Sequence, residues 1–155
     1  MALPTELIHE LKHAIAGDVR DDFTTRLLYS TDASIYQIEP LGVVFPRSKE
    51  DISAIVELSA KYSVPLLPRG AGSSLAGQAV GAAPVLDTSR YMNRILEINS
   101  KERTATVEPG VLLTALNRAA GKHGLVFGPD PASADRATVG GSVGNNATGA
   151  HSILY

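Results

Sequence analysis

Cysteine is absent from this chain of 155 residues. The absence excludes, within these residues, disulfide bonds, thiolate metal sites, iron–sulfur ligation and a cysteinyl bond to a cofactor. It also agrees with a reducing compartment. We therefore expect a cytoplasmic protein.

An excess of basic charge and a long apolar run are missing as well. Fourteen Lys and Arg face sixteen Asp and Glu, for a formal net charge of −2. The basic residues are scattered, so no attraction to nucleic acid or anionic lipid is expected. No apolar run approaches the roughly 18 residues of a membrane span, and Met1 to Glu6 carry no basic region ahead of an apolar core. We expect no nucleic-acid partner, no membrane span and no secretion.

Two patterns of catalytic chemistry are also missing. Asp87, Asp130 and Asp135 lie outside any His-x-x-x-His or similar ligand pattern, so we expect no metal site. No Gly-x-Ser-x-Gly elbow is present, which leaves Ser73 and Ser74 without the setting of a nucleophile. These two patterns therefore give no candidate catalytic residue.

The apolar spacing predicts a mixture of helices and strands. Hydrophobic residues make up 44% of the chain, enough for a buried core. Ser48 and Asp51 resemble a capping box, which predicts a helix over 49–62 between strands at 42–46 and 64–68, a βαβ unit with parallel strands. The other expected elements are helices at 5–16, 21–30 and 111–122, a strand at 85–87, and a hairpin of 95–98 with 104–107. We divide the chain into an N-terminal helical segment, residues 1–40, and a domain over residues 41–155.

A glycine-rich loop, residues 70–78, follows the second strand of this unit. Gly70, Gly72 and Gly77 have no Cβ, so consecutive amides can converge here on an oxyanion. Arg69 can add positive charge. Ligands commonly bind where the strands of α/β sheets end. By itself the loop also fits an ordinary turn after a strand.

The glycine loop departs from two well-known phosphate signatures. Leu75 stands where a dinucleotide fingerprint has its third glycine. Positions 72 and 77 have the spacing of a Walker loop, but Gln78 and Ala79 replace its lysine and hydroxyl, which disfavours triphosphate hydrolysis. The residues fit an anion-binding loop with Ser73 and Ser74 as hydroxyl donors, suited to holding a diphosphate.

A second polar and glycine-rich region covers residues 128–133 and 137–151. The four glycines of residues 137–151, with Ser142, Asn145, Asn146 and Thr148, make a poor core and a good ligand lining. Asparagine offers both a donor and an acceptor, so it can bind the edge of a flavin, an adenine or a ribityl chain. A cluster of polar turns is the other interpretation.

Four segments in order resemble a known family. They are residues 68–78, 107–111, 127–133 and 138–152. Together they closely resemble the FAD-linked oxidase family, with an FAD-binding domain of the p-cresol methylhydroxylase type. Its members include dehydrogenases and oxidases of the D-2-hydroxy acids lactate, glycolate and 2-hydroxyglutarate. The resemblance runs from about residue 28 to the last residue.

The resemblance implies an α+β flavin domain with an N-terminal βαβ subdomain and the start of a second, mixed-sheet subdomain, with FAD extended between them. Relatives that bind FAD covalently through this loop have histidine where Ser73 stands, so FAD is expected to be non-covalent here. The resemblance implies that the following residues bind the cofactor: Arg69, Gly70, Ala71, Gly72, Ser73, Ser74, Gln78, Pro109, Gly110, Pro129, Asp130, Ser133, Thr138, Gly141, Asn145 and Thr148.

The family's chemistry implies further partners. In the family, a hydride passes from the 2-hydroxy acid to FAD, and the electrons pass on to a quinone, a cytochrome, an electron-transfer flavoprotein or an iron–sulfur domain. The acceptor can place such a protein at the periphery of a membrane. The base and the arginine that binds the substrate carboxylate come from a C-terminal cap domain. The chain ends at Tyr155 before that domain, so we expect a truncated fragment that is inactive alone.

The stretches 29–34 and 40–44 look most like the long fusion members of the family, which append an iron–sulfur domain.

Two alternative functions stay open. One is a flavoenzyme similar to UDP-N-acetylenolpyruvoylglucosamine reductase, which shares the fold and uses a nicotinamide donor. The other is a stand-alone nucleotide- or phosphate-binding module.

Overall fold

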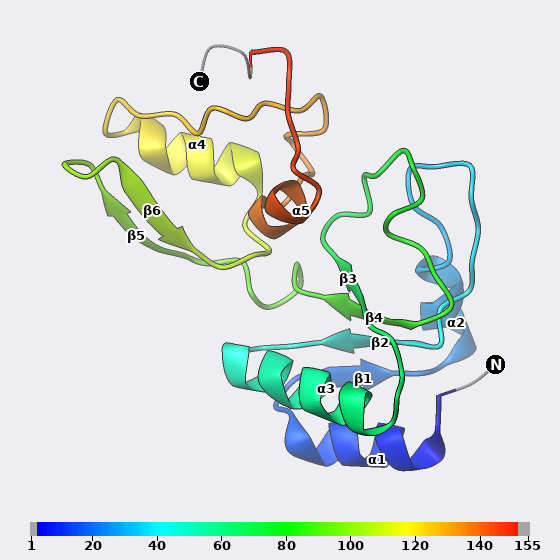
Figure 1. Cartoon of the computed structure of the whole chain (residues 1–155). Helices are drawn as coiled ribbons and strands as arrows, with labels where there is room; N and C mark the ends of the chain where they lie inside the picture. The colour runs from blue at the N-terminus through cyan, green and yellow to red at the C-terminus, as the bar shows by residue number, and fades with distance from the viewer. Residues whose placement is uncertain (1–2, 152–155) are drawn as a thin grey trace. The chain divides into compact units, whose positions relative to one another are not determined.

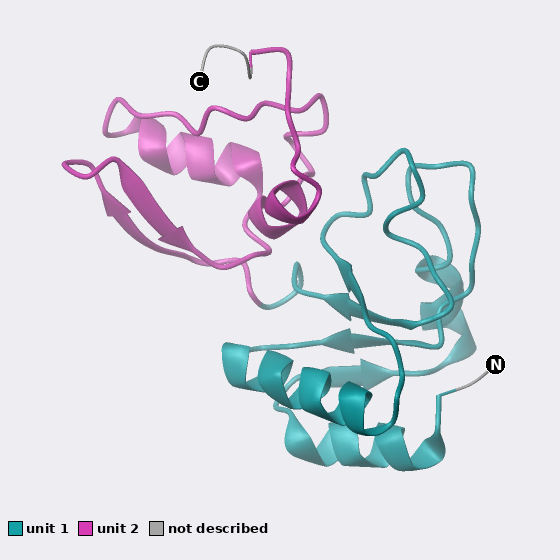
Figure 2. Ribbon diagram, in the orientation of Figure 1, with its two compact units in different colours: residues 1–91 teal, residues 92–155 magenta. Residues whose placement is uncertain are grey.

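The chain forms two compact units, residues 1–91 and residues 92–155 (Figure 2). A computed structural model describes residues 3–151. In this part of the chain, no helix has the length and apolar character that crossing a membrane requires. Each unit contains both helices and strands, so the expected α+β architecture is confirmed.

The first unit is built on a mixed sheet of four strands in the order β1-β2-β4-β3. The strands are β1 (Asp18–Arg20), β2 (Gly42–Phe45), β3 (Leu67–Arg69) and β4 (Pro84–Asp87). The β2, β4 and β3 strands run parallel, and β1 pairs antiparallel with β2. The parallel β2 and β3 strands confirm the expected βαβ unit, and β4 lies between them in the sheet.

Two helices, α1 (Thr5–Ala14) and α3 (Lys49–Lys61), cover one face of this sheet (Figure 1). Every residue of β2 is buried, as is every residue of β4, and alternate side chains point to opposite faces. Val44 packs with Leu7 and Ile55 beneath the helices. Val43 and Val85 form a second cluster on the other face. The short helix α2 (Phe23–Leu28) follows β1.

The second unit holds a hairpin and two helices. Strands β5 (Ile95–Asn99) and β6 (Thr104–Val107) pair antiparallel, as the sequence predicts. The helix α4 (Leu113–Gly121) buries Leu113 and Leu116, and the six-residue helix α5 (Val139–Gly144) follows Thr138.

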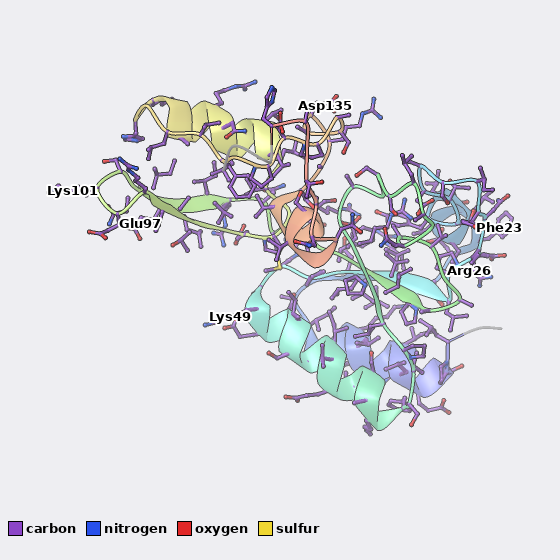
Figure 3. The ribbon with its side chains drawn as sticks, turned by 45° about the horizontal axis from the view of Figure 1, so that its top comes forward. Phe23, Arg26, Lys49, Glu97, Lys101 and Asp135 are labelled. Atoms are coloured by element: carbon purple, nitrogen blue, oxygen red, sulfur yellow. The ribbon has the colours of Figure 1, made fainter. Side chains whose placement is uncertain are left out.

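In both units, charged side chains such as Lys49, Glu97 and Lys101 are exposed and point away from the ribbon (Figure 3).

Three local expectations differ from the structure. The strand β1 lies inside the segment expected to be helical, where Val19 is its only buried residue. The β3 strand begins at Leu67 rather than at residue 64. The helix α5 falls in the polar, glycine-rich region, for which no helix was predicted. Three of its six residues are glycine, which lowers helix propensity, and its N-terminus is capped by the Thr138 hydroxyl.

A buried carboxylate fixes the start of α3. Ser48 accepts a hydrogen bond from the Asp51 amide, as the capping pattern predicts. The Asp51 carboxylate, 5% exposed, accepts hydrogen bonds from the amides of Ala16 at 3.0 Å and Arg47 at 2.8 Å. It therefore joins the end of α1 to the start of α3.

We predict that Asp51→Ala lowers the free energy of unfolding by about 3 kcal/mol, because two amides lose a charged acceptor in a buried place. Glu57→Ala, on the exposed side of α3, is the matched control and should change the free energy by less than about 0.5 kcal/mol. Urea unfolding followed by circular dichroism measures both. Equal losses in the two variants would contradict the role of Asp51.

An ion pair closes the base of the hairpin in the second unit. Glu108 is 8% exposed and accepts hydrogen bonds from the Arg94 amide at 2.7 Å and from Arg94 Nη2 at 2.6 Å. The Arg94 guanidinium holds the pKa of the Glu108 carboxyl below its usual range, against the opposing effect of burial. The ionised form of Glu108 is therefore the one that stabilises the fold.

The sign of the pH dependence follows from this direction. A lowered pKa means that the stabilisation is complete above the ordinary carboxyl value of about 4.3 and is lost as the pH falls below it. We predict a shallower loss of unfolding temperature below about pH 5 for Glu108→Gln than for the native protein. Glu102→Gln, in the exposed turn of the hairpin, is the control and should follow the native curve.

Candidate cofactor-binding site

The glycine loop begins where β3 ends. Arg69, the last residue of β3, pairs with Asp87, the last residue of β4. Because the two strands are parallel, their carboxyl ends share one edge of the sheet, which is where open α/β sheets commonly bind ligands. The loop therefore lies where the sequence places it.

Five successive amides of the glycine loop are available to a ligand. Within residues 3–151, the backbone N–H groups of residues 71–75 donate no hydrogen bond to the protein. Gly72 has φ +66°, so the chain turns there in a conformation that favours glycine. Unpaired amides in a turn of this kind form an anion-binding site. The loop therefore offers several donors to an anionic group.

Two of the expected site residues shape the end of the loop. The Ser74 hydroxyl donates to Gln78 Oε1 at 2.6 Å and accepts from the amides of Ala76 at 3.2 Å and Gln78 at 3.4 Å. Ser73 is half-buried and forms no side-chain hydrogen bond with the described residues. Ser73 is therefore the hydroxyl of the loop that has no protein partner there.

Arg69 has protein partners that the sequence did not indicate. Its Nη1 donates to the carbonyl oxygens of Ala79 at 2.9 Å and Tyr29 at 3.3 Å, and its Nη2 donates to that of Thr31 at 2.9 Å. The guanidinium carbon lies 5.1 Å from the centre of the Tyr29 ring. The side chain predicted to add charge for a phosphate is thus bonded to the backbone around the loop.

In the second unit, several expected site residues bond to one another or to neighbouring backbone. The Gly110 amide donates to the Met92 carbonyl at 2.7 Å, and the Gly141 amide donates to the Thr138 hydroxyl at 3.2 Å. The Pro109 carbonyl accepts from the Gly140 amide at 2.8 Å. A Cβ at position 140 would lie 2.7 Å from the Pro109 Cβ, so only glycine allows this approach. These contacts fix the backbone of this part of the second unit.

A carboxylate joins two loops of the second unit. The Asp130 Oδ1 accepts a hydrogen bond from the His151 amide at 3.1 Å, and the His151 ring contacts Oδ2. Hydrogen bonds from His151 hold the pKa of the Asp130 carboxyl below its usual range. A Cβ at Gly149 would lie 2.2 Å from the Asp130 carbonyl oxygen, so the two loops meet closely. The half-buried Pro129 precedes this contact.

Three expected residues of the second unit present free side chains. Ser133 is half-buried, and Asn145 and Thr148 are exposed. None of the three forms a side-chain hydrogen bond with residues 3–151. Their hydroxyl and amide groups are therefore available to the polar edges of a ligand.

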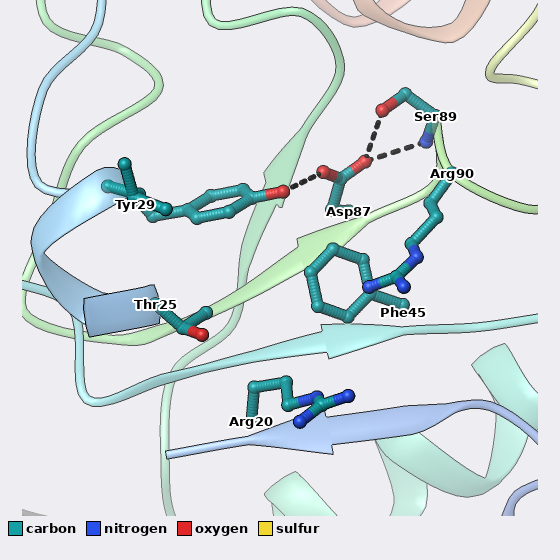
Figure 4. A pocket seen from close by; sticks show the side chains of 8 residues that line it. Arg20, Thr25, Tyr29, Phe45, Asp87, Ser89 and Arg90 are labelled. Atoms are coloured by element: carbon teal, nitrogen blue, oxygen red, sulfur yellow. Dashed lines mark hydrogen bonds between the residues drawn. The ribbon is translucent and has the colours of Figure 1, made fainter. Parts of the chain in front are cut away.

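A pocket of about 330 Å³ lies in the first unit, beside α2 and the sheet (Figure 4). The Tyr29 phenol donates to Asp87 Oδ2 at 2.6 Å, and Ser89 donates to Asp87 Oδ1 from its amide and its hydroxyl, both at 2.7 Å. Burial and the Asp87 carboxylate raise the pKa of the Tyr29 phenol. The pocket is lined by Arg20, Thr25, Leu28, Tyr29, Phe45, Asp87, Ser89 and Arg90.

None of these lining residues is among the expected cofactor residues. In the sequence, Asp87 is noted only as a carboxylate outside any metal-ligand pattern. Its carboxylate accepts a hydrogen bond from the Ser89 amide two residues later. Tyr29 contributes to both places, because its carbonyl binds Arg69 and its ring lines the pocket.

The family model described as an FAD binding domain matches residues 40–155. Among curated proteins, the D-2-hydroxyglutarate dehydrogenase of Escherichia coli (strain K12) is 40% identical over 157 residues, which cover 99% of this chain and 15% of that protein. The glycolate oxidase subunit GlcD of Bacillus subtilis (strain 168) is 38% identical over 140 residues, which cover 87% of this chain and 29% of that protein.

Solved structures share the fold. An alkyldihydroxyacetonephosphate synthase matches with a TM-score of 0.87 at 28% identity, over 98% of this chain and 34% of that chain. p-Cresol methylhydroxylase with substrate bound matches with a TM-score of 0.74 at 20% identity, over 91% of this chain and 28% of that chain. At this identity the second likeness shows the fold alone.

The chain spans 15% of the length of the first of these curated relatives and 29% of the second. The family model covers most of the chain. The glycine loop lies inside the matched region. The chain belongs to the family of FAD-binding domains, as the resemblance in its sequence implies.

Proposed function

We propose that this chain is the FAD-binding portion of a flavin-dependent dehydrogenase or oxidase that acts on a D-2-hydroxy acid, and that the glycine loop binds the FAD diphosphate. The run of unpaired amides at residues 71–75 carries the proposal. The names of the D-2-hydroxyglutarate dehydrogenase and glycolate oxidase relatives support the reaction class.

The residues of the chain bind and orient the cofactor. The amide dipoles of residues 71–75 offset the charge of the diphosphate, and the free Ser73 hydroxyl adds a donor. Ser133, Asn145 and Thr148 supply side-chain donors and acceptors for the remaining polar edges. When bound, FAD supplies the hydride acceptor for oxidation of the hydroxyl-bearing carbon. The other expected cofactor residues remain part of the proposed site, and they shape it through the contacts described above.

The catalytic groups lie outside this chain in our proposal. The family resemblance assigns the base and the carboxylate-binding arginine to a cap domain. An iron–sulfur domain on the same polypeptide is the electron acceptor we favour, since residues 29–34 look like the long fusion members and the D-2-hydroxyglutarate dehydrogenase relative is about seven times as long as its match. The cytoplasmic location stays a prediction.

The nicotinamide-dependent reductase is not favoured. Relatives at 40% and 38% identity are a D-2-hydroxyglutarate dehydrogenase and a glycolate oxidase subunit. The stand-alone binding module is likewise not favoured, because the relatives extend well beyond the matched region.

We predict that the complete protein, reconstituted with FAD, is yellow and that anaerobic addition of D-2-hydroxyglutarate, D-lactate or glycolate bleaches its visible flavin band. The substrate reduces the bound cofactor, and no oxygen is present to restore it. Stopped-flow absorbance measures the rate for each acid.

NADPH and L-2-hydroxyglutarate are the matched controls and should leave the flavin oxidised. Rapid bleaching by NADPH with none by the hydroxy acids would support the reductase and overturn the proposal. Failure to bind FAD at all would contradict the assigned cofactor.

We also predict that FAD is released when the protein is precipitated with acid, because serine stands at position 73 where covalent relatives have histidine. The flavin absorbance should appear in the supernatant. Ser73→Ala should release it equally. Flavin that stays with the pellet of the native protein would show a covalent bond.

A further inference from the structure

The Arg69 side chain joins the glycine loop to a segment upstream of the family match, residues 29–37. Its guanidinium donates to the Tyr29 and Thr31 carbonyls on one side and to the Ala79 carbonyl, just past the loop, on the other. The family model begins at residue 40. One planar cation therefore connects two segments that are distant in sequence, and one of them lies outside the matched domain.

The positive-φ glycines of the loop leave room for protein side chains. A Cβ at Gly72 would lie 2.5 Å from Arg69 Nη2, and a Cβ at Gly77 would lie 2.5 Å from Cδ2 of the Tyr36 ring. Both residues have φ near +70°, at +66° and +73°. The loop thus folds directly over Arg69 and against residues 29–37.

Further hydrogen bonds join the same two segments. The Ala33 amide donates to the Gly72 carbonyl at 3.0 Å, and the Ala79 amide donates to Asp32 Oδ2 at 3.2 Å. Burial acts to raise the pKa of Asp32, but hydrogen bonds from Ser34 and Ala79 and the charge of Arg69 hold that pKa below its usual range. Asp32 therefore stays ionised at neutral pH and keeps its acceptor role.

We propose that Arg69 is a positioning residue: together with residues 29–37 it fixes the glycine loop in the shape that presents the amides of residues 71–75, and it acts without contacting the diphosphate. This rests on the proposed function, in which the loop binds the FAD diphosphate. The part of the chain needed for FAD binding then begins at Tyr29. A domain boundary at residue 40 would separate the glycine loop from the residues that hold it in place.

Charge and shape separate this role from direct phosphate binding. A guanidinium has five N–H donors in one plane, and three hydrogen bonds to carbonyls at three positions use that shape. A lysine keeps the positive charge but lacks the planar fork. A phosphate ligand tolerates lysine and depends on ionic strength, whereas a planar clamp on carbonyls does not tolerate it.

The first experiment needs no cofactor. Hydrogen exchange is measured by mass spectrometry on the complete, flavin-free protein and on Arg69→Lys. The hydrogen-bonded amides in peptides covering residues 29–37 and 70–79, such as those of Ala33 and Ala79, should exchange at least about tenfold faster in the variant, because the two segments lose their shared support.

Arg90→Lys is the matched control, because Arg90 stacks over Phe45 at the same edge of the sheet. It should leave both peptides unchanged. Asp32→Ala removes the acceptor for Ala79 without altering any arginine, and it should speed exchange in the same two peptides. Unchanged exchange in Arg69→Lys would overturn the positioning role whether or not FAD binds.

The second experiment compares FAD with riboflavin, which has no diphosphate. We expect Arg69→Lys and Arg69→Met to weaken FAD by similar factors, about 10- to 100-fold, and to leave riboflavin affinity nearly unchanged. The loss should persist from about 50 mM to about 500 mM salt. A loss confined to Arg69→Met that fades with salt would show a direct phosphate contact and overturn the proposal.

The two proposals fail in different ways. A native protein that binds riboflavin as tightly as FAD would contradict the loop's role as the diphosphate site, while the exchange experiment would still decide whether Arg69 fixes the loop. Equal weakening of FAD and riboflavin in the variants would indicate a general loss of structure and would also count against the positioning role.

Discussion

The hydrogen bonds from the Arg69 guanidinium to three backbone carbonyls determine how the glycine loop lies on the sheet. The loop leaves the sheet at the end of β3, the Ala79 carbonyl beyond it accepts a hydrogen bond from Arg69, and the amides of residues 71–75 have no acceptor among residues 3–151. A loop with so few bonds of its own needs its shape fixed from outside. The bond to Thr31 ties it to the preceding segment, and that segment follows α2. The available amides therefore depend on contacts well away from the glycines.

Local sequence signals predicted the elements that local forces stabilise. Ser48 and Asp51 marked the start of α3, and the hairpin of β5 and β6 followed from apolar runs around a polar turn. The βαβ unit was predicted from the same capping pattern and from the spacing of apolar residues. The β1 strand escaped prediction because three residues with one buried side chain have no periodicity, and only pairing with β2 makes them a strand. The helix α5 was not predicted because its glycines oppose helix formation, although a side-chain cap stabilises its N-terminus.

The same distinction applies to the candidate site: its local features were predicted from the sequence, and the contacts of its side chains were not. The sequence located the glycine loop, since missing Cβ atoms and a preceding strand are local features. It did not reveal the partners of Arg69, because no pattern states where a long side chain points. It also did not separate residues whose amides are already bonded, such as Gly110 and Gly141, from those with free side chains, such as Asn145 and Thr148. Both kinds occur within residues 138–152, and only the structure distinguishes them.

Glycine in these loops therefore has a structural meaning beyond ligand access. Gly72 makes room for the Arg69 guanidinium, Gly77 for the Tyr36 ring, and Gly140 for Pro109. Each allows a close approach within the protein. A loop already fixed in its binding shape loses little conformational freedom when a ligand arrives, so more of the interaction energy appears as affinity. The glycine pattern that suggests a phosphate-binding loop in the sequence thus produces, in the fold, a loop whose shape depends on close contacts with its own protein.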